Sequence, residues 1–548
     1  MSGGLSLAQD ARPPRPDTVM RDALPTPVMK DDLAPVMAAD GSGLPFELWR
    51  GLDVASLETL IGELEIPPRS PALHASWKRL ITSSVTLAPG VETDAKFTAL
   101  RLEALYRSGL ADDAAKELAR QNGAGDPLLI ALSARNELAS GRAAKACEIM
   151  RAGAALKPQM PKRLRAQAIL MSGYCAAIAG DTAGAGLAGE LAREEGLETS
   201  PGLDALDALS IGAKPKLSTF KTLSLLDYRI VEKVGGIGAK QVLEKAEPAL
   251  LVALANDPAT PADIGLPASE AAARRNGLTP ETLAAIYRAN GKTESAETLL
   301  AAKGGSDINH RASLFKAAEI EKTPIKKTRL IRAFLDDAKH QGLSFQALQM
   351  IAPAITTLAP AEELTWFAET AAEIGLASGQ YEMTRRWVAL ATSPDRPDTN
   401  LSHWLALTDI ADPKASNRGA DLEALLPLAN RGRFQPEALH RVATVLDALN
   451  YNVPIPLWDA ASRTPQPDGG YLPPTGVLSE LQDAAKKKEY GRTVLLTMKT
   501  LGPNGAEGAH IIALGDSIRA LKRAGLEPDA RRLALEALLF AWPRGAAN

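Results

Sequence analysis

The sequence predicts an all-α protein built from stacked helical hairpins. Ala and Leu dominate its composition, whereas aromatic residues make up only 4%. Ala and Leu are among the residues that lose least on entering a helix. A phrase with a turn glycine and an amphipathic stretch also recurs, as in LASGRAAKACEIMRAGA (138–154), LASGQYEMTRRWVALA (376–391) and RAGLEPDARRLALEAL (523–538). Because no segment alternates like a strand, we expect fewer than about ten residues in strands.

Length and charge narrow the possible classes of protein. A chain of 548 residues is too long for one compact core, which favours several domains or an extended array. The formal charge of −3 gives no electrostatic case for nucleic-acid binding, so we expect no nucleic-acid partner. The segment VEKVGGIGAKQVLEKA (231–246) resembles the helix-hairpin-helix motif, but Val242 stands where that motif has Ala, and a glycine turn between helices is the other interpretation. The longest apolar stretch, 168–180, is shorter than the roughly 20 residues of a membrane span.

The N-terminal segment, 1–44, is rich in Pro, Asp and Gly without helical periodicity, so we expect it to be disordered. Within it, GLSLA followed by QDARPP is similar to the end of a signal peptide, with small residues around a cleavage site. This pattern favours a periplasmic location with a leader that is shortened in this sequence. A chance match in a disordered tail, and with it a cytoplasmic location, is the alternative.

Turn glycines define the hairpins that follow. Six of them align the repeated phrase: Gly109, Gly141, Gly180, Gly291, Gly379 and Gly525. Five positions after each glycine stands a small residue: Ala114, Ala146, Ala185, Ala296, Thr384 and Ala530. Seven positions before each glycine stand Leu102, Ala134, Gly173, Ala284, Ala372 and Ile518. A glycine supplies the left-handed turn after a helix, and small flanking residues let two antiparallel helices approach closely.

In chain order we expect N-terminal hairpins over 45–202, a central array over 203–410, a hairpin over 411–450 and C-terminal hairpins over 477–548. A long Pro-rich loop over 451–476 separates the last two. Its apolar residues are too many for a solvated tether, so we expect this loop to be ordered against the array.

The glycine-to-small-residue spacing resembles the tetratricopeptide-repeat (TPR) hairpin. The glycines lie 32, 39, 111, 88 and 146 residues apart rather than a steady 34, and only Tyr287 supplies the aromatic residue expected four positions before the glycine. The resemblance therefore implies a degenerate TPR-like, right-handed superhelical solenoid. The phrases LWRGLDVASLETLIGEL, WFAETAAEIGLASG and GLEPDARRLALEALL are also similar to a family of uncharacterised proteobacterial helical proteins, some labelled "antifreeze". That resemblance implies no mechanism, and the threonines here follow no 11-residue period suited to ice.

Signatures of catalysis and metal binding are missing from the sequence. The six histidines form no HxxxH or HxH pair, neither cysteine has a neighbour at metal-ligand spacing, and no G-x-S-x-G occurs. Lytic transglycosylases carry a helical superhelix and need a Glu-Ser pair, but Glu294-Ser295 lacks the stretch that should follow it. We expect no metal, no cofactor and no enzyme activity.

The predicted function is therefore a non-enzymatic scaffold or adaptor that binds a protein or peptide partner, in an envelope-associated complex. The alternative is an enzyme or accessory subunit acting on peptidoglycan or glycan, with carboxylates brought together from distant hairpins. Candidate partner-binding residues are Arg385 and Arg386, together with Trp458 and Tyr471 in the long loop. Adjacent helical residues diverge by about 100°, so one of the two arginines should face solvent or a partner.

The two cysteines lie symmetrically about a turn. Cys147 stands 14 residues before Pro161 and Cys175 stands 14 after it. Two antiparallel helices with equal rise per residue would place these positions side by side. A disulfide would close a loop worth about 3–4 kcal/mol and would favour the periplasm. Two buried free thiols are the alternative.

Overall fold

The computed structural model describes residues 47–83, 94–120, 126–197, 199–235, 237–302, 307–392, 400–416 and 418–545. Over these ranges the chain is helical and contains no strand; isolated bridges pair Leu223 with Ala246 and Tyr471 with Ala509. The all-α prediction is confirmed. The predicted disordered segment, 1–44, lies outside the described residues. None of the helices in these ranges combines the length and the apolar character needed to cross a membrane.

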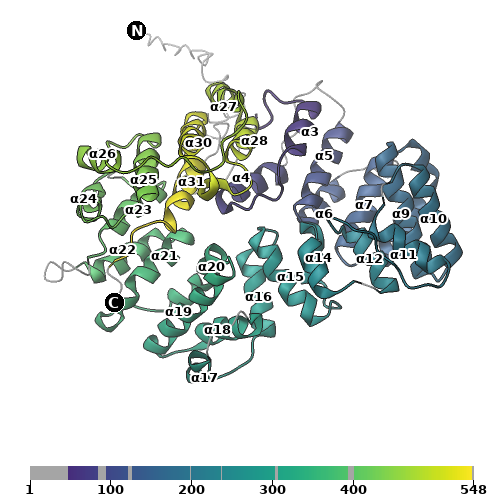
Figure 1. The fold of residues 1–548 in the computed structure, drawn as a ribbon, viewed down its shortest axis with the longest axis horizontal. Coiled ribbons are helices and arrows are strands. Elements are labelled where there is room, and N and C mark those ends of the chain that lie inside the picture. Colours follow the sequence, from purple (N-terminus) through teal and green to yellow (C-terminus); the bar gives the residue numbers. More distant parts are fainter. Residues whose placement is uncertain are drawn as a thin grey trace, which may run out of the picture.

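The first part of the chain forms helices that extend from the middle of Figure 1 to its right side. They are α3 (Val54–Gly62), α4 (Pro71–Thr82), α5 (Asp94–Arg107), α6 (Ala111–Arg120), α7 (Pro127–Ala139), α8 (Ala143–Ala152), the 3-10 helix η1 (Ala154–Gln159), α9 (Lys162–Ile178), α10 (Thr182–Glu194), α11 (Pro201–Ser210) and α12 (Leu225–Val234). Capping residues set several starts: the side chains of Asp53, Ser70 and Asp126 accept backbone N–H groups of α3, α4 and α7.

The middle of the chain continues through the lower part of the molecule and up its left side (Figure 1). Its helices are α13 (Ala239–Lys245), α14 (Pro248–Asn256), α15 (Ala262–Arg274), α16 (Pro280–Asn290), α17 (Ala296–Ala301), α18 (Ile308–Ile320), α19 (Pro324–His340), α20 (Ser344–Ile355), η2 (Glu362–Phe367), α21 (Ala368–Ala377), α22 (Tyr381–Ala391), α23 (His403–Ala411), η4 (Leu422–Leu425), α24 (Leu426–Asn430), α25 (Pro436–Ala448) and α26 (Ile455–Ser462).

The last helices return to the beginning of the chain. They are α27 (Val477–Lys486), α28 (Tyr490–Leu501), α29 (Gly505–Gly508), α30 (Ile511–Ala524) and α31 (Glu527–Leu539). Helix α31 packs on α4, and α28 packs on both α3 and α4, so the path closes on itself (Figure 1). The backbone N–H of Gly491 donates to the carbonyl of Leu48 at 2.9 Å, and Lys499 pairs with Glu63 at 2.6 Å across the same junction. The two ends of the helical array therefore cover each other.

The turn glycines behave as predicted at five of six positions. Each of those five has a positive φ, between 70° at Gly379 and 93° at Gly525. Gly291 is the exception, because its φ is −65° and the backbone continues in an extended conformation. A Cβ at that position would lie 2.6 Å from the carbonyl oxygen of Ala312, so close helix packing requires this glycine. The six small residues that follow the glycines by five positions are all buried, as are the six that precede them by seven.

The predicted long loop over 451–476 is wrong in its first half. Residues 455–462 form helix α26, with Leu457 fully buried and Ile455 exposed. Pro456 stands in the first turn, where a helix tolerates proline. The rest of the segment crosses to the end of α29: the N–H of Tyr471 donates to Gly508 at 2.8 Å, and its carbonyl accepts from His510 at 3.0 Å.

Candidate functional site

A cavity of about 590 Å³ lies where the ends of the array meet. We call it the central cavity. Helices α4 and α31, the turn between α15 and α16, helix α20, the turn between α21 and α22 and the segment after α23 supply its walls. Its charged and polar lining consists of His74, Lys78, Asn276, Thr279, Gln346, Gln349, Ser378, Tyr381, Asp412, Lys414, Arg532 and Glu536. A cavity of this size is typical of small-ligand sites.

Glu536 holds the wall formed by α31 to the start of α4. Its Oε2 accepts the hydroxyl of Ser70 and the backbone N–H of Ala72, both at 2.8 Å, and its Oε1 accepts the N–H of Ala506 at 3.3 Å. Burial raises the pKa of the Glu536 carboxyl to about 7, although these hydrogen bonds act in the opposite direction. Near neutral pH the carboxyl group is therefore divided between its neutral and charged forms.

Asp529 forms a second connection between the same two helices. This carboxylate is 2% exposed and accepts hydrogen bonds from Ser76 and Arg79 of α4, and from Arg532 of its own helix at 2.9 Å. Burial alone would raise the pKa of Asp529, but Arg532 and Arg79 outweigh burial and hold it below its ordinary value. A charged Asp529 thus binds α4 to α31 behind the cavity wall.

His74 and Lys78 lie one turn apart on the cavity side of α4. Burial and, to a smaller extent, the nearby Lys78 ammonium lower the pKa of His74 to about 4. The imidazole is therefore neutral at pH 7, and its buried Nδ1 has no hydrogen-bond partner within the part of the chain that the structure describes. Lys78 makes no ion pair with the described part of the chain.

A second, more polar cavity of about 690 Å³ adjoins the first, and we call it the side cavity. Gly379, Tyr381, Asp412 and Lys414 line both. The predicted partner-binding residues Arg385 and Arg386 both line the side cavity. Arg386 is exposed, whereas Arg385 binds Asp412 at 2.6 Å and Glu382 at 2.5 Å.

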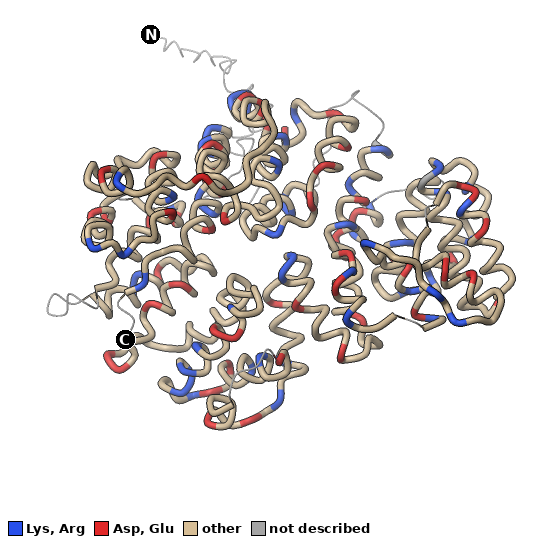
Figure 2. The backbone as a smooth tube through the Cα atoms, viewed as in Figure 1, with Lys and Arg blue, Asp and Glu red and all other residues tan. Residues whose placement is uncertain are grey.

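Acidic side chains balance these arginines in the side cavity. Asp409 and Asp421 lie in its wall together with Asp412 and Glu382. Burial raises the pKa of Asp421, and the charge of Asp409 raises it further. Figure 2 shows Lys and Arg interspersed with Asp and Glu along the whole array. The side cavity is thus lined by both basic and acidic side chains, close together at the ends of hairpin helices.

The other two predicted partner-binding residues lie elsewhere. Trp458 is 45% exposed on α26, and Tyr471 is 38% exposed beside Gly502, where an added Cβ would lie 2.6 Å from its ring. Neither residue lines the central or the side cavity. The structure therefore brings Arg385 and Arg386 together with acidic partners, and it leaves Trp458 and Tyr471 apart from them.

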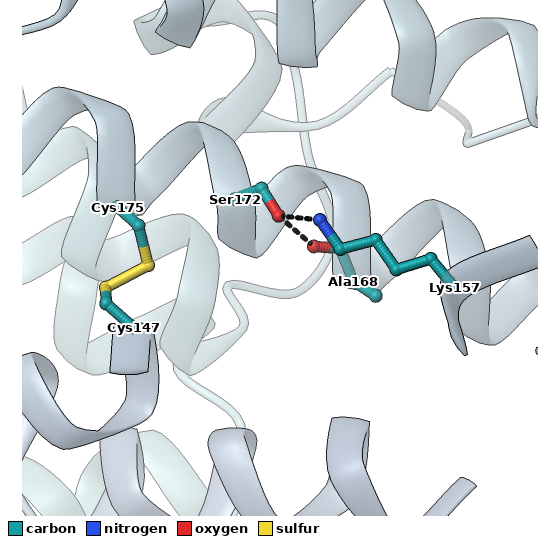
Figure 3. The surroundings of a disulfide bond; sticks show 5 residues. All are labelled: Cys147, Lys157, Ala168, Ser172 and Cys175. Carbon is teal, nitrogen blue, oxygen red and sulfur yellow. Dashed lines mark hydrogen bonds between the residues drawn. A yellow bond between two sulfur atoms is a disulfide. The ribbon is translucent and has the colours of Figure 1, made fainter. Parts of the chain in front are cut away.

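A disulfide joins Cys147 of α8 to Cys175 of α9, with the two Cα atoms 5.6 Å apart (Figure 3). Nearby, the ammonium of Lys157 donates to the hydroxyl of Ser172 at 2.6 Å, and that hydroxyl donates to the carbonyl of Ala168 at 3.0 Å. The disulfide links the second helix of one hairpin, α8, to the first helix of the next, α9.

No cluster of His, Cys, Asp and Glu suited to a metal ion occurs within the ranges that the structure describes. Comparisons of the chain with protein-family models, with curated proteins and with solved structures gave no match. Sequence reasoning missed His74, Lys78, Arg532 and Glu536. Each is a polar residue of the kind that any amphipathic helix carries, and only the contact between α4 and α31 brings the four together.

Proposed function

We propose that the chain is a non-enzymatic scaffold that binds an extended segment of a protein or peptide partner. The observation that carries this proposal is the side cavity, where the exposed Arg386 stands among acidic and basic side chains at hairpin ends. A surface with both signs of charge selects a partner by electrostatic complementarity and fixes its register.

The architecture supports the same interpretation. Five left-handed turn glycines, each followed by a buried small residue, agree with stacked hairpins of a degenerate TPR-like, right-handed superhelical solenoid. Such arrays expose long surfaces formed by successive hairpins, and they are widely suited to binding other chains.

We place this function in the periplasm of a bacterium. Two observations support that compartment: the disulfide between Cys147 and Cys175, which persists in oxidising surroundings, and the GLSLA segment before QDARPP. A chain isolated from its native envelope should contain no free thiol when it is denatured without reduction. Two free thiols per chain would contradict the periplasmic assignment.

Affinity capture from native envelope tests the proposed function. The wild-type chain, an Arg386→Glu variant and a Lys240→Glu variant would be compared, with captured proteins quantified by mass spectrometry. Lys240 is a matched control because its side chain is 89% exposed and lies on α13, which does not line either cavity. We expect a stoichiometric partner that the wild type and the control retain and that Arg386→Glu loses at least tenfold. Equal recovery by all three chains would refute the role of the side cavity.

One observation favours the alternative, an enzyme acting on peptidoglycan or glycan. A carboxyl group with a pKa near 7, as Glu536 has, is suited to donate a proton to a glycosidic oxygen. Both oxygens of Glu536 are nevertheless engaged by Ser70, Ala72 and Ala506, which favours a structural role. Release of muropeptides from purified peptidoglycan by the wild type, lost in Glu536→Gln, would establish the alternative. We expect no release from either.

A further inference from the structure

The central cavity combines apolar walls with cationic side chains. Phe345 of α20, Leu376 of α21 and Leu535 of α31 are among its apolar lining residues. Prolines at helix starts, such as Pro71 and Pro280, extend that apolar surface. An apolar ligand body would be shielded from water on several sides by these groups.

Positive charge in this cavity exceeds the negative charge available to neutralise it. Lys78 and Lys414 line it, and neither ammonium is paired with a carboxylate among the described residues. Arg532 also lines it, and its guanidinium binds the carboxylate of Asp529, which Arg79 binds as well.

The acidic groups of the same lining are already neutralised or engaged. Asp412 binds the guanidinium of Arg385 at 2.6 Å and accepts the backbone N–H of Lys414 at 2.8 Å. Glu536 is the other acidic lining residue, and Ser70 together with the start of α4 occupies its Oε2. The excess of positive charge is therefore open to a ligand.

The ends of helices add to this positive potential. Five helices of ten or more residues contribute first-turn residues to the lining: Pro71 of α4, Pro280 of α16, Phe345 of α20, Tyr381 of α22 and Pro528 of α31. The N-terminus of a helix carries partial positive charge and stabilises an anion placed near it.

We propose that the central cavity binds an amphipathic anion, a small molecule with one carboxylate and an apolar body such as a medium-chain fatty acid. Lys78, Arg532 and Lys414 attract the carboxylate, and the apolar walls cover the chain. Lys78 lines only the central cavity and Arg386 lines only the side cavity, so anion binding and partner binding can each fail without the other.

Isothermal titration calorimetry with three probes tests the proposal on the full-length protein: decanoate, the neutral decanol and the cationic decyltrimethylammonium. Decanoate should bind one per chain, with decanol weaker by about tenfold, the effect of about 1.4 kcal/mol. Decyltrimethylammonium should not bind in the cavity. Lys78→Gln should weaken decanoate about tenfold, whereas the matched Lys240→Gln on the exposed face of α13 should leave its affinity unchanged.

A second variant tests the apolar part of the site. Ala75→Phe on α4 places a ring in the cavity and should abolish decanoate binding while circular dichroism retains its helical signal. Equal affinity for decanoate and decanol, or equal affinity of Lys78→Gln and Lys240→Gln, would overturn the proposed anion selectivity. Undiminished binding to Ala75→Phe, or no decanoate binding to the wild type, would overturn the location and the site itself.

Discussion

Replacing Glu536 with Gln should remove a pH dependence of stability that this single carboxyl group creates. Glu536 is 5% exposed, and burial raises the pKa of its carboxyl from 4.5 to about 7. The unfolded chain loses this proton near pH 4.5, whereas the folded chain keeps it until about pH 7. The contribution of Glu536 to stability is therefore fully present below pH 4.5, and it is lost as the pH rises through 7.

The size of this effect follows from the two pKa values. One pKa unit corresponds to about 1.4 kcal/mol, so a pKa raised from 4.5 to about 7 corresponds to about 3 kcal/mol. His74 acts in the opposite direction, because burial lowers its pKa from 6.5 to about 4. The stability that neutral His74 contributes is present above pH 6.5 and is lost as the pH falls through 4. Between pH 4.5 and 6.5 the effects of Glu536 and His74 on the unfolding free energy of the wild type therefore nearly cancel.

A comparison of variants separates the two groups. Urea unfolding followed by circular dichroism would be measured from pH 4.5 to 8 for the wild type, for Glu536→Gln and for Glu58→Gln. Glu58 lies exposed on α3, so Glu58→Gln is a control that makes the same substitution at a position that is not buried. The difference in unfolding free energy between the wild type and Glu536→Gln should move by about 3 kcal/mol across this range, in favour of the variant as the pH rises.

The unfolding free energy of Glu58→Gln should change with pH in parallel with that of the wild type. A difference between the wild type and Glu536→Gln that varies by less than about 1 kcal/mol over the same range would refute the reasoning. It would mean that the carboxyl titrates near pH 4.5 in the folded chain and that the contact between α4 and α31 admits water to it.

Three further changes test the packing. Cys147→Ala should lower the unfolding free energy by about 3–4 kcal/mol in non-reducing urea titrations, since the lost bond closes a 28-residue separation; an unchanged midpoint would contradict this. Gly291→Ala should cost about 1–3 kcal/mol in thermal unfolding, because the new Cβ meets the carbonyl of Ala312; a neutral result would mean that the helices separate easily. Arg311 of α18 donates to both carboxylate oxygens of the buried Glu270 of α15, at 2.7 and 2.8 Å. Arg311→Met should therefore lower the unfolding free energy by about 3–5 kcal/mol, because the Glu270 carboxylate stays buried without this guanidinium, and replacing Glu270 by Leu as well should restore most of the loss.

The hairpins could be predicted because the information for them is local. A glycine such as Gly379 and the buried Thr384 that follows it lie within one turn and one helix, so their spacing is visible in the sequence. Gly291 shows the limit of this reasoning. The same residue type at the same spacing serves there for close packing on Ala312, and a sequence does not distinguish a glycine needed for φ from one needed for space.

The prediction of a loop over 451–476 is wrong in its first half for a physical reason. Its prolines favoured a loop, but Pro456 lies in the first turn of α26, where the missing N–H has no partner to lose. The apolar residues then divide by helical geometry: Leu457 is buried, whereas Ile455 is 82% exposed. Pro456 therefore marks the start of a helix, whereas the sequence pattern around it predicted a loop.

The central cavity could not be predicted, because its walls come from opposite ends of the chain. Ser70 and Glu536, which bind each other at 2.8 Å, are 466 positions apart. Each belongs to a helix whose pattern is fully explained by local packing, and no periodicity relates them. The two cysteines, by contrast, are 28 positions apart, on the two sides of one turn. The equal rise per residue of the two helices was therefore enough to suggest the disulfide from the sequence.

The closure of the array also changes what its terminal helices do. The ends of an open repeat array need polar outer faces, because their last hairpins have no neighbour to cover them. Here α4 and α31 cover each other instead, and the buried carboxylates of Asp529 and Glu536 accept hydrogen bonds from α4. A buried charge tolerates few other pairings, since every mismatched register would leave it without a partner. These acidic groups thus specify which two helices meet, and with that contact they fix the wall of the central cavity that α4 and α31 form.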